Sequence, residues 1–174
     1  IFASTSKITF SGSGVAVMAA SKENIADMKK SMTVQTIGHD KLNMLRHVRF
    51  LKNKENVLSH MKKHSEIIAP KFEAVLSALD KEIAPIGGCD WTKPNGGYFI
   101  SFNAPEGCAK RIVELCKEAG VVLTGAGATF PYGKDPDDKN IRIAPTYPSV
   151  SDLSLATELF CICVKLAYAE KLLG

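Results

Sequence analysis

Tyr98-Phe99-Ile100-Ser101-Phe102 is an aromatic and apolar run typical of a β-strand, and it decides the fold class. Four segments of this kind are predicted strands, at residues 89–92, 98–102, 121–124 and 140–143. Apolar residues at helical spacing predict helices at residues 54–83, at residues 107–119 and from Ser149 or Ser151 towards the C-terminus. The order helix, strand, strand, helix, strand, strand, helix indicates an α+β fold, in which a small, mostly antiparallel sheet carries helices on one face.

The residues before this region predict a second unit. Residues 8–10 and 15–20 have the character of strands. Residues 15–20 are small and apolar throughout, which predicts burial on both faces. A helix over residues 40–51 is expected to turn three apolar side chains inward, those of Leu42, Leu45 and Val48.

The helical pattern over residues 54–83 is far longer than an average helix and contains Pro70, which predicts a kink or a division there. Long helices of this kind often connect two structural units. We therefore predict one domain over residues 1–55 and a second over residues 56–174. The chain begins with Ile1 rather than Met and opens in chemically rich sequence, so we expect it to be a piece of a longer protein.

Composition and charge exclude several classes of protein. The chain has 174 residues, of which 45% are hydrophobic and 23% charged, as in an ordinary globular protein. Its 22 basic and 18 acidic residues leave a net charge of +4 with no basic block, so no nucleic-acid partner is predicted. No apolar run approaches the roughly 18 residues of a membrane span, and no signal peptide is recognisable.

The cysteines and histidines do not form a recognisable metal or redox motif. Five cysteines is an odd number, and no pair has the two-residue gap of a zinc or redox motif, so we expect reduced thiols and a cytoplasmic location. His60 and His64 are four residues apart, a spacing that can bind a metal, but no third ligand is placed nearby. We predict a solvated helix face there and no metal site.

Ser4-Thr5-Ser6-Lys7 is the first candidate for chemistry. A lysine that attacks a carbonyl must be neutral, and neighbouring hydroxyl groups can bind a phosphate. On the tetrapeptide alone, a solvated lysine in a polar loop fits better.

Two further candidates lie in the second predicted domain. In Asn95-Gly96-Gly97-Tyr98-Phe99, two glycines ahead of a strand allow a ligand to approach closely, and a simple tight turn explains them equally well. Arg142 lies between Ile141 and Ile143, so it points to the opposite face of its strand from both. Its planar guanidinium matches a carboxylate, although an arginine at a solvated edge is the better explanation of this residue alone.

The order and spacing of these motifs together resemble the C-terminal half of a fold-type I, class I/II aminotransferase. The motifs are Ser4-Thr5-Ser6-Lys7, Pro94 to Phe99, Gly120-Val121 with Gly125-Ala126-Gly127 and Phe130, and Ile141-Arg142-Ile143. Three stretches are also similar to a bacterial aspartate aminotransferase subgroup, namely residues 6–10, 45–50 and 140–145. The resemblance covers essentially the whole chain.

This resemblance implies a role for each candidate residue. Lys7 would form the internal aldimine with pyridoxal 5′-phosphate (PLP) and would move a proton between the substrate α-carbon and the cofactor. Ser4 and Ser6 would contact the cofactor phosphate. Arg142 would bind the substrate α-carboxylate, and Gly97 would face the substrate entrance. An acidic amino acid such as aspartate or glutamate would be the amino donor and 2-oxoglutarate the acceptor, in a homodimer.

The resemblance also assigns the two domains and shows one departure. Residues 1–55 would be the remnant of a large α/β PLP-binding domain, and residues 56–174 the small C-terminal domain. The family has Gly-x-Arg after the lysine, and that arginine binds the phosphate. Here the matching residues are Gly12-Ser13-Gly14, so Ser13 or backbone N–H groups would have to substitute.

The remaining expectations concern the activity of residues 1–174 alone and the alternative functions of the protein. The family's N-terminal half supplies the acidic partner of the pyridine nitrogen, so we expect residues 1–174 alone to lack useful activity. Another PLP enzyme on the same fold, such as an aromatic aminotransferase or a β-lyase, is one alternative. An aminotransferase-like effector domain of a transcriptional regulator is the other.

Overall fold

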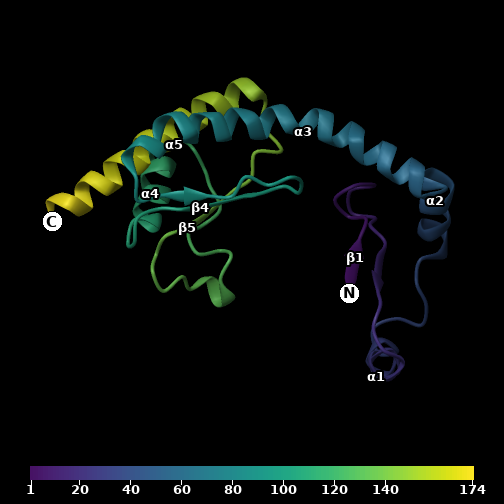
Figure 1. The fold of residues 1–174 in the computed structure, drawn as a ribbon. Coiled ribbons are helices and arrows are strands. Elements are labelled where there is room, and N and C mark those ends of the chain that lie inside the picture. The colour runs from purple at the N-terminus through teal and green to yellow at the C-terminus, as the bar shows by residue number, and fades with distance from the viewer. The chain divides into compact units, whose positions relative to one another are not determined.

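A computed structural model describes residues 1–174, which divide into two compact units, residues 1–65 and residues 66–174. The elements are coloured along the chain in Figure 1. The α-helices are α1 (Lys22–Met32), α2 (Lys41–Leu51), α3 (Lys54–Glu82), α4 (Ala109–Glu118) and α5 (Val150–Leu173). The strands are β1 (Phe2–Ser4), β2 (Ala16–Met18), β3 (Asp90–Trp91), β4 (Ile100–Asn103) and β5 (Asn140–Ile143). Two 3₁₀ helices span Ala84–Ile86 and Pro131–Gly133. No helix combines the length and the apolar character needed to cross a membrane.

The first unit begins with a two-stranded hairpin. β1 and β2 pair antiparallel, with Phe2 opposite Met18 and Ser4 opposite Ala16. The strand predicted at residues 8–10 is wrong, because residues 5–9 close a helical turn instead. The predicted burial of residues 15–20 on both faces is also not found, since Val17 remains 62% exposed in a sheet of only two strands.

Helix α2 buries a different face from the one predicted. Leu42, Leu45 and Val48 were expected to point inward, but they are 81%, 45% and 65% exposed. The buried residue of this helix is His47, whose exposed fraction is 5%. It is turned inward because the hydroxyl groups of Thr5 and Thr9 offer it hydrogen-bond partners, which apolar side chains could not use.

Helix α3 runs from the first unit into the second as one continuous helix of 29 residues that contains Pro70. Of the predicted kink or division at Pro70, the division is therefore wrong, since proline removes only one backbone donor from a helix that neighbouring hydrogen bonds maintain. The solvated face predicted for His60 and His64 is also corrected. Both are half-buried, and the His60 Nε2 atom contacts the carbonyl oxygen of Ile8.

The second unit is built on a three-stranded antiparallel sheet in the order β3-β4-β5. Its register places Ile100 opposite Ile143 and Ser101 opposite Arg142. Because side chains alternate along a strand, one face of β4 and β5 is apolar and the other is polar.

The apolar face of the sheet packs against α3, α4 and α5 and forms the core of the second unit (Figure 1). Large fully buried members of this core are Val75, Leu79, Ile100, Phe102, Ile112, Ile141 and Val164. The Lys165 ammonium at α5 donates to the Glu82 carboxylate at the end of α3 across 2.8 Å, which ties the two helices together. The α+β fold with helices on one face of a small antiparallel sheet is thus confirmed.

Residues 121–124 do not form the predicted strand. The Val121 N–H donates to the carbonyl oxygen of Cys116 at 2.8 Å, so the backbone closes the end of α4 and does not join the sheet. The predicted start of the last helix is confirmed, because the Ser149 hydroxyl accepts the Asp152 N–H at 3.1 Å as an N-cap.

Candidate functional site

The turn that carries Lys7 follows directly from β1. The Thr5 carbonyl oxygen accepts the N–H groups of Ile8 at 2.9 Å and Thr9 at 3.0 Å, which closes one helical turn around Lys7. The Thr5 N–H donates to the Val15 carbonyl at 2.9 Å, so the turn is also anchored to the segment that enters β2. Lys7 lies exposed in the middle of this turn.

Ser4 and Ser6 lie beside Lys7 and contact each other. The Ser6 N–H donates to the Ser4 Oγ at 3.1 Å, and the two hydroxyl groups form a short hydrogen bond. Gly14 passes close to Ser6, because a Cβ added there would lie 2.6 Å from the Ser6 Oγ. Two exposed hydroxyl donors next to an amine, under a backbone that leaves no room for a side chain, fit the phosphate and the aldehyde of PLP.

A guanidinium lies beside the loop that lacks the family's arginine, but it comes from α2. The Arg46 Cζ is 4.1 Å from the centroid of the Phe10 ring, and its Nη2 donates to the Asn43 Oδ1 at 2.9 Å. The Asn43 Nδ2 in turn donates to the Ser13 carbonyl at 2.8 Å. Arg46 shares a shallow hollow with the carboxylate of Asp40, which disfavours an anion there.

Arg142 is the centre of the site in the second unit. It lies on the polar face of β5 opposite Ser101, and its Cζ is 4.6 Å from the centroid of the Phe99 ring. Its Nε is buried and has no hydrogen-bond partner in the chain. The planar guanidinium of this residue suits an anionic ligand such as a carboxylate, which it can bind through two parallel hydrogen bonds.

Asn140, two residues before Arg142, organises the polar face of the sheet. Its Nδ2 donates to the Ser101 Oγ at 2.9 Å and to the Asn103 Oδ1 at 2.8 Å. Its Oδ1 accepts the Thr129 hydroxyl at 2.5 Å. All of the polar atoms of this buried amide are therefore used, and they attach the loop before β5 to the sheet.

The same loop is held by a carboxylate. The Asp135 Oδ2 accepts the N–H groups of Lys139 at 2.8 Å and Asn140 at 2.7 Å, and its Oδ1 accepts that of Asp137 at 3.1 Å. Partial burial opposes ionisation, but these three donors outweigh it and hold the pKa of Asp135 below its usual value. Gly127 is required in this loop, because its φ is +73° and a Cβ would lie 3.0 Å from the Gly133 carbonyl oxygen.

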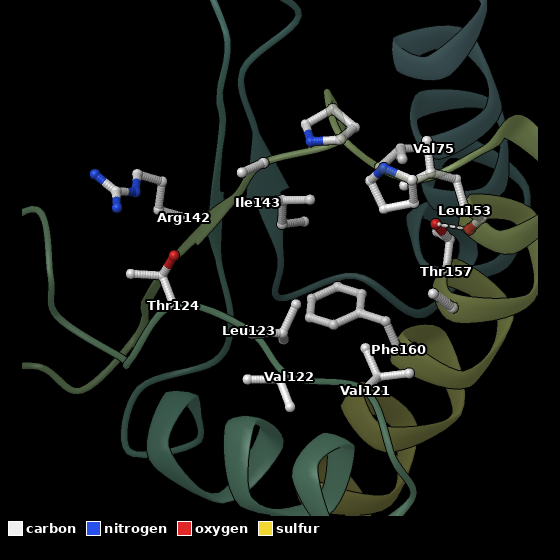
Figure 2. A pocket seen from close by; sticks show the side chains of 14 residues that line it. Val75, Val121, Val122, Leu123, Thr124, Arg142, Ile143, Leu153, Thr157 and Phe160 are labelled. Carbon is white, nitrogen blue, oxygen red and sulfur yellow. Dashed lines mark hydrogen bonds between the residues drawn. The ribbon is translucent and has the colours of Figure 1, made fainter. Parts of the chain in front are cut away.

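An apolar cavity of about 170 Å³ lies on the other side of β5, between the strand, residues 121–124 and α5. Figure 2 shows Leu123, Phe160 and Leu153 lining it, while the Arg142 guanidinium points away. Arg142 therefore borders the cavity with the inner part of its side chain and directs its guanidinium away from it.

The structure brings the predicted residues together in two groups. Ser4, Ser6 and Lys7 share one turn in the first unit. In the second unit, Gly97 precedes Phe99 by two residues, and the Phe99 ring lies against Arg142. Gly97 has a φ of +94° with open space beside it, which favours glycine for its conformation.

Sequence reasoning missed three residues that support these groups. They are His47 behind the Lys7 turn, Phe99 beneath Arg142, and Asn140 at the start of β5. The adjacency of Phe99 to the glycine pair was visible, but the hydrogen bonds of the other two join residues far apart in the chain.

Comparison with known proteins identifies the family. A family model described as "Aspartate amino-transferase" matches residues 1–174. An aspartate aminotransferase of Corynebacterium glutamicum is 45% identical over 169 residues, which are 97% of this chain and 39% of that protein. The chain spans about two fifths of the length of the curated relatives it matches.

Solved structures give the same result. The crystal structure of an aspartate transaminase from Corynebacterium glutamicum matches with a TM-score of 0.93 and 45% identity, over 98% of this chain and 40% of that one. An α-aminoadipate aminotransferase from Thermus thermophilus, complexed with N-(5′-phosphopyridoxyl)-L-leucine, shares the fold with a TM-score of 0.75 at 21% identity, over 95% of this chain and 41% of that one. The chain thus belongs to the aspartate aminotransferase family.

Proposed function

We propose that this chain is the C-terminal part of a PLP-dependent aminotransferase that takes its amino group from an acidic amino acid. The observation that carries the aminotransferase part of the proposal is the Arg142 guanidinium, which is held against the Phe99 ring and whose buried Nε has no acceptor in the chain. The α-carboxylate is the group that all amino acids and oxo acids share, and it would pair with this guanidinium.

The residues of the first unit supply the other half of the proposed chemistry. When bound, PLP would act as the electron sink that stabilises the carbanion. The Lys7 Nζ would hold the cofactor. Once the substrate has displaced this amine, the amine would move a proton between the substrate α-carbon and the cofactor. The Ser4 and Ser6 hydroxyls would donate hydrogen bonds to the phosphate, and Arg142 would orient the α-carbon by fixing the carboxylate.

Several finer statements belong to the same proposal. We assign residues 1–55 to the large PLP-binding domain and residues 56–174 to the small domain, with Gly97 at the substrate entrance. Aspartate or glutamate as donor and 2-oxoglutarate as acceptor are supported by the name of the Corynebacterium glutamicum relative. The homodimer, the cytoplasmic location and the inactivity of residues 1–174 by themselves remain predictions.

The proposal is tested on the full-length protein. Visible absorbance after addition of PLP is expected to show a band that Lys7→Ala abolishes, while the control Lys29→Ala, at an exposed lysine of α1, keeps it. A donor panel with 2-oxoglutarate is expected to favour aspartate and glutamate over aromatic amino acids and cysteine conjugates. A band that survives Lys7→Ala, or a preference for aromatic donors, would overturn the corresponding part of the proposal.

A further inference from the structure

His47 is the only buried residue among residues 1–65, with 5% of its surface exposed. Histidine is seldom buried unless its ring nitrogens are satisfied. In this unit the burial of one polar side chain among exposed apolar ones indicates that its contacts matter for the arrangement around it.

Both ring nitrogens of His47 have partners. The Nδ1 lies 2.9 Å from the Asn43 carbonyl oxygen, which can only accept, so Nδ1 carries a proton and donates it. In the neutral ring the Nε2 is then an acceptor. The Thr5 hydroxyl, 3.1 Å away, accepts the Val15 N–H and donates to this nitrogen. The Thr9 hydroxyl lies 2.9 Å from the same nitrogen and donates its single proton either to it or to the Thr5 carbonyl oxygen, 3.0 Å away.

Thr5 and Thr9 are the two ends of the turn that carries Lys7. Residues four apart lie on the same side of a helical turn, which explains why one ring nitrogen reaches both hydroxyls. Lys7 is two residues from both Thr5 and Thr9, which corresponds to about 200° of rotation around the turn. The Lys7 Cα therefore lies on the side of the turn opposite His47.

The turn needs such a support. A single helical turn fixes the dihedral angles of three residues for very few hydrogen bonds, and is therefore unstable by itself. The Thr5 carbonyl oxygen is a second acceptor for the Thr9 hydroxyl at 3.0 Å, and the Phe10 ring packs edge-on against the His47 ring at 5.2 Å. His47 thus contacts both ends of the turn, and Phe10, the residue after the turn, packs against the His47 ring.

We propose that His47 is a positioning residue for Lys7: it holds the Thr5–Thr9 turn in the conformation that presents the lysine amine to PLP. The inference rests on the proposed function, since it requires that Lys7 binds PLP. A preorganised amine loses less conformational freedom when it binds the cofactor, so the support increases affinity and the rate of attachment.

The test compares variants of the full-length protein. His47→Leu fills the same space without either hydrogen bond, and His47→Gln restores a polar atom at about the distance of Nε2. Thr9→Val removes one hydroxyl and keeps the shape of the side chain. His39→Leu, at an exposed histidine outside this cluster, is the matched control. The readouts are the dissociation constant for PLP, the rate at which the visible band forms, and the fraction of Lys7 labelled after borohydride reduction.

His47→Leu is expected to fold, as shown by circular dichroism. It should raise the PLP dissociation constant about tenfold and slow band formation, because both hydrogen bonds of the ring are lost. His47→Gln should recover most of the affinity, and Thr9→Val should shift both quantities in the same direction as His47→Leu. His39→Leu should match the wild-type protein.

Wild-type affinity and rate in both His47→Leu and Thr9→Val would overturn the inference. So would a loss in His47→Leu that His47→Gln does not restore, because the hydrogen bonds would then not be the cause. If His47→Leu does not fold, Thr9→Val decides by itself. Failure of the proposed function is distinguishable, since the wild-type protein would then give neither the band nor a label on Lys7.

Discussion

The guanidinium of Arg142 lies over the ring of Phe99, with its Cζ 4.6 Å from the ring centroid, while its buried Nε has no partner. The ring comes from the residue just before β4 and the guanidinium from β5, so the pairing of these two strands creates the contact. The aromatic face fixes the direction of the guanidinium without using any of its donors, which leaves them available to a carboxylate.

Replacing Arg142 should therefore weaken substrate binding strongly. Arg142→Lys keeps the charge but loses the planar pair of donors, and we expect KM for both the amino acid and the oxo acid to rise about 100-fold, which corresponds to about 2.7 kcal/mol. Steady-state kinetics of the full-length enzyme measure this. The control Arg49→Lys, at an exposed residue of α2, should leave KM unchanged. An unchanged KM in Arg142→Lys would show that another group binds the carboxylate.

Removing the aromatic face should have a smaller effect in the same direction. Phe99→Leu deletes a cation–π contact worth about 0.5–2 kcal/mol, so KM should rise about twofold to thirtyfold with kcat less affected. Tyr147→Leu removes a ring that is 96% exposed and serves as the control. Equal kinetic constants for the two variants would contradict the positioning role of Phe99.

The polar face of the sheet should depend on Asn140. Asn140→Ala leaves the polar groups of Ser101, Asn103 and Thr129 without their partner, and we expect the free energy of unfolding to fall by about 2–3 kcal/mol. Chemical denaturation followed by circular dichroism measures the change. Asn95→Ala, at an exposed loop position, should cost less than about 0.5 kcal/mol. A similar small loss in both variants would mean that the network does not stabilise the unit.

The Asp135 carboxylate should make the loop before β5 sensitive to acid. Its pKa is lower in the folded chain than in the unfolded one, so its stabilising contribution is fully present above the unfolded value of about 4 and is lost as the pH falls through the folded value. Asp135→Asn should reduce stability at pH 7 by about 1–2 kcal/mol and should reduce the dependence of stability on pH below 4. Denaturation midpoints between pH 2.5 and 7 test both, and an unchanged acid dependence would contradict the assignment.

The cysteines of the second unit should be chemically inert in the native state. Burial raises the pKa of the Cys89 and Cys161 thiols to about 11 and that of Cys116 to about 12. At pH 8 only about one thiol in a thousand is then ionised at Cys89 and Cys161 and about one in ten thousand at Cys116, so alkylation by iodoacetamide should be at least about 100-fold slower than for free cysteine. Mass spectrometry of the labelled peptides measures the rate, with the denatured chain as reference. Rapid labelling of native Cys161 would contradict its burial.

Much of the second unit could be predicted from local sequence. The strand at residues 140–143, the helix of residues 109–118 and the N-cap Ser149 follow from alternation, helical spacing and capping chemistry, which involve neighbours in the chain. The strand expected at residues 121–124 has the right composition, yet its backbone closes α4 instead. Composition alone cannot tell which backbone partner a strand-like segment will find.

The first unit was harder to predict for the same reason. The sequence predicted apolar residues on the inner face of α2, but the inner residue is His47, whose partners Thr5 and Thr9 lie about 40 residues earlier. His60 likewise is half-buried and contacts the Ile8 carbonyl oxygen. A polar side chain is buried where hydrogen-bond partners from distant parts of the chain come together. The pattern of neighbouring residues does not show where that happens.

The sequence by itself determined the family, the α+β class and the identities of Lys7 and Arg142 as candidates, because motifs and short-range periodicity are properties of neighbouring residues. Only the tertiary structure decided that Phe99 supports Arg142 and that His47 supports the turn of Lys7. Those contacts arise from strand pairing and from a helix packing against a distant turn. They depend on distances in space that the order of residues does not contain.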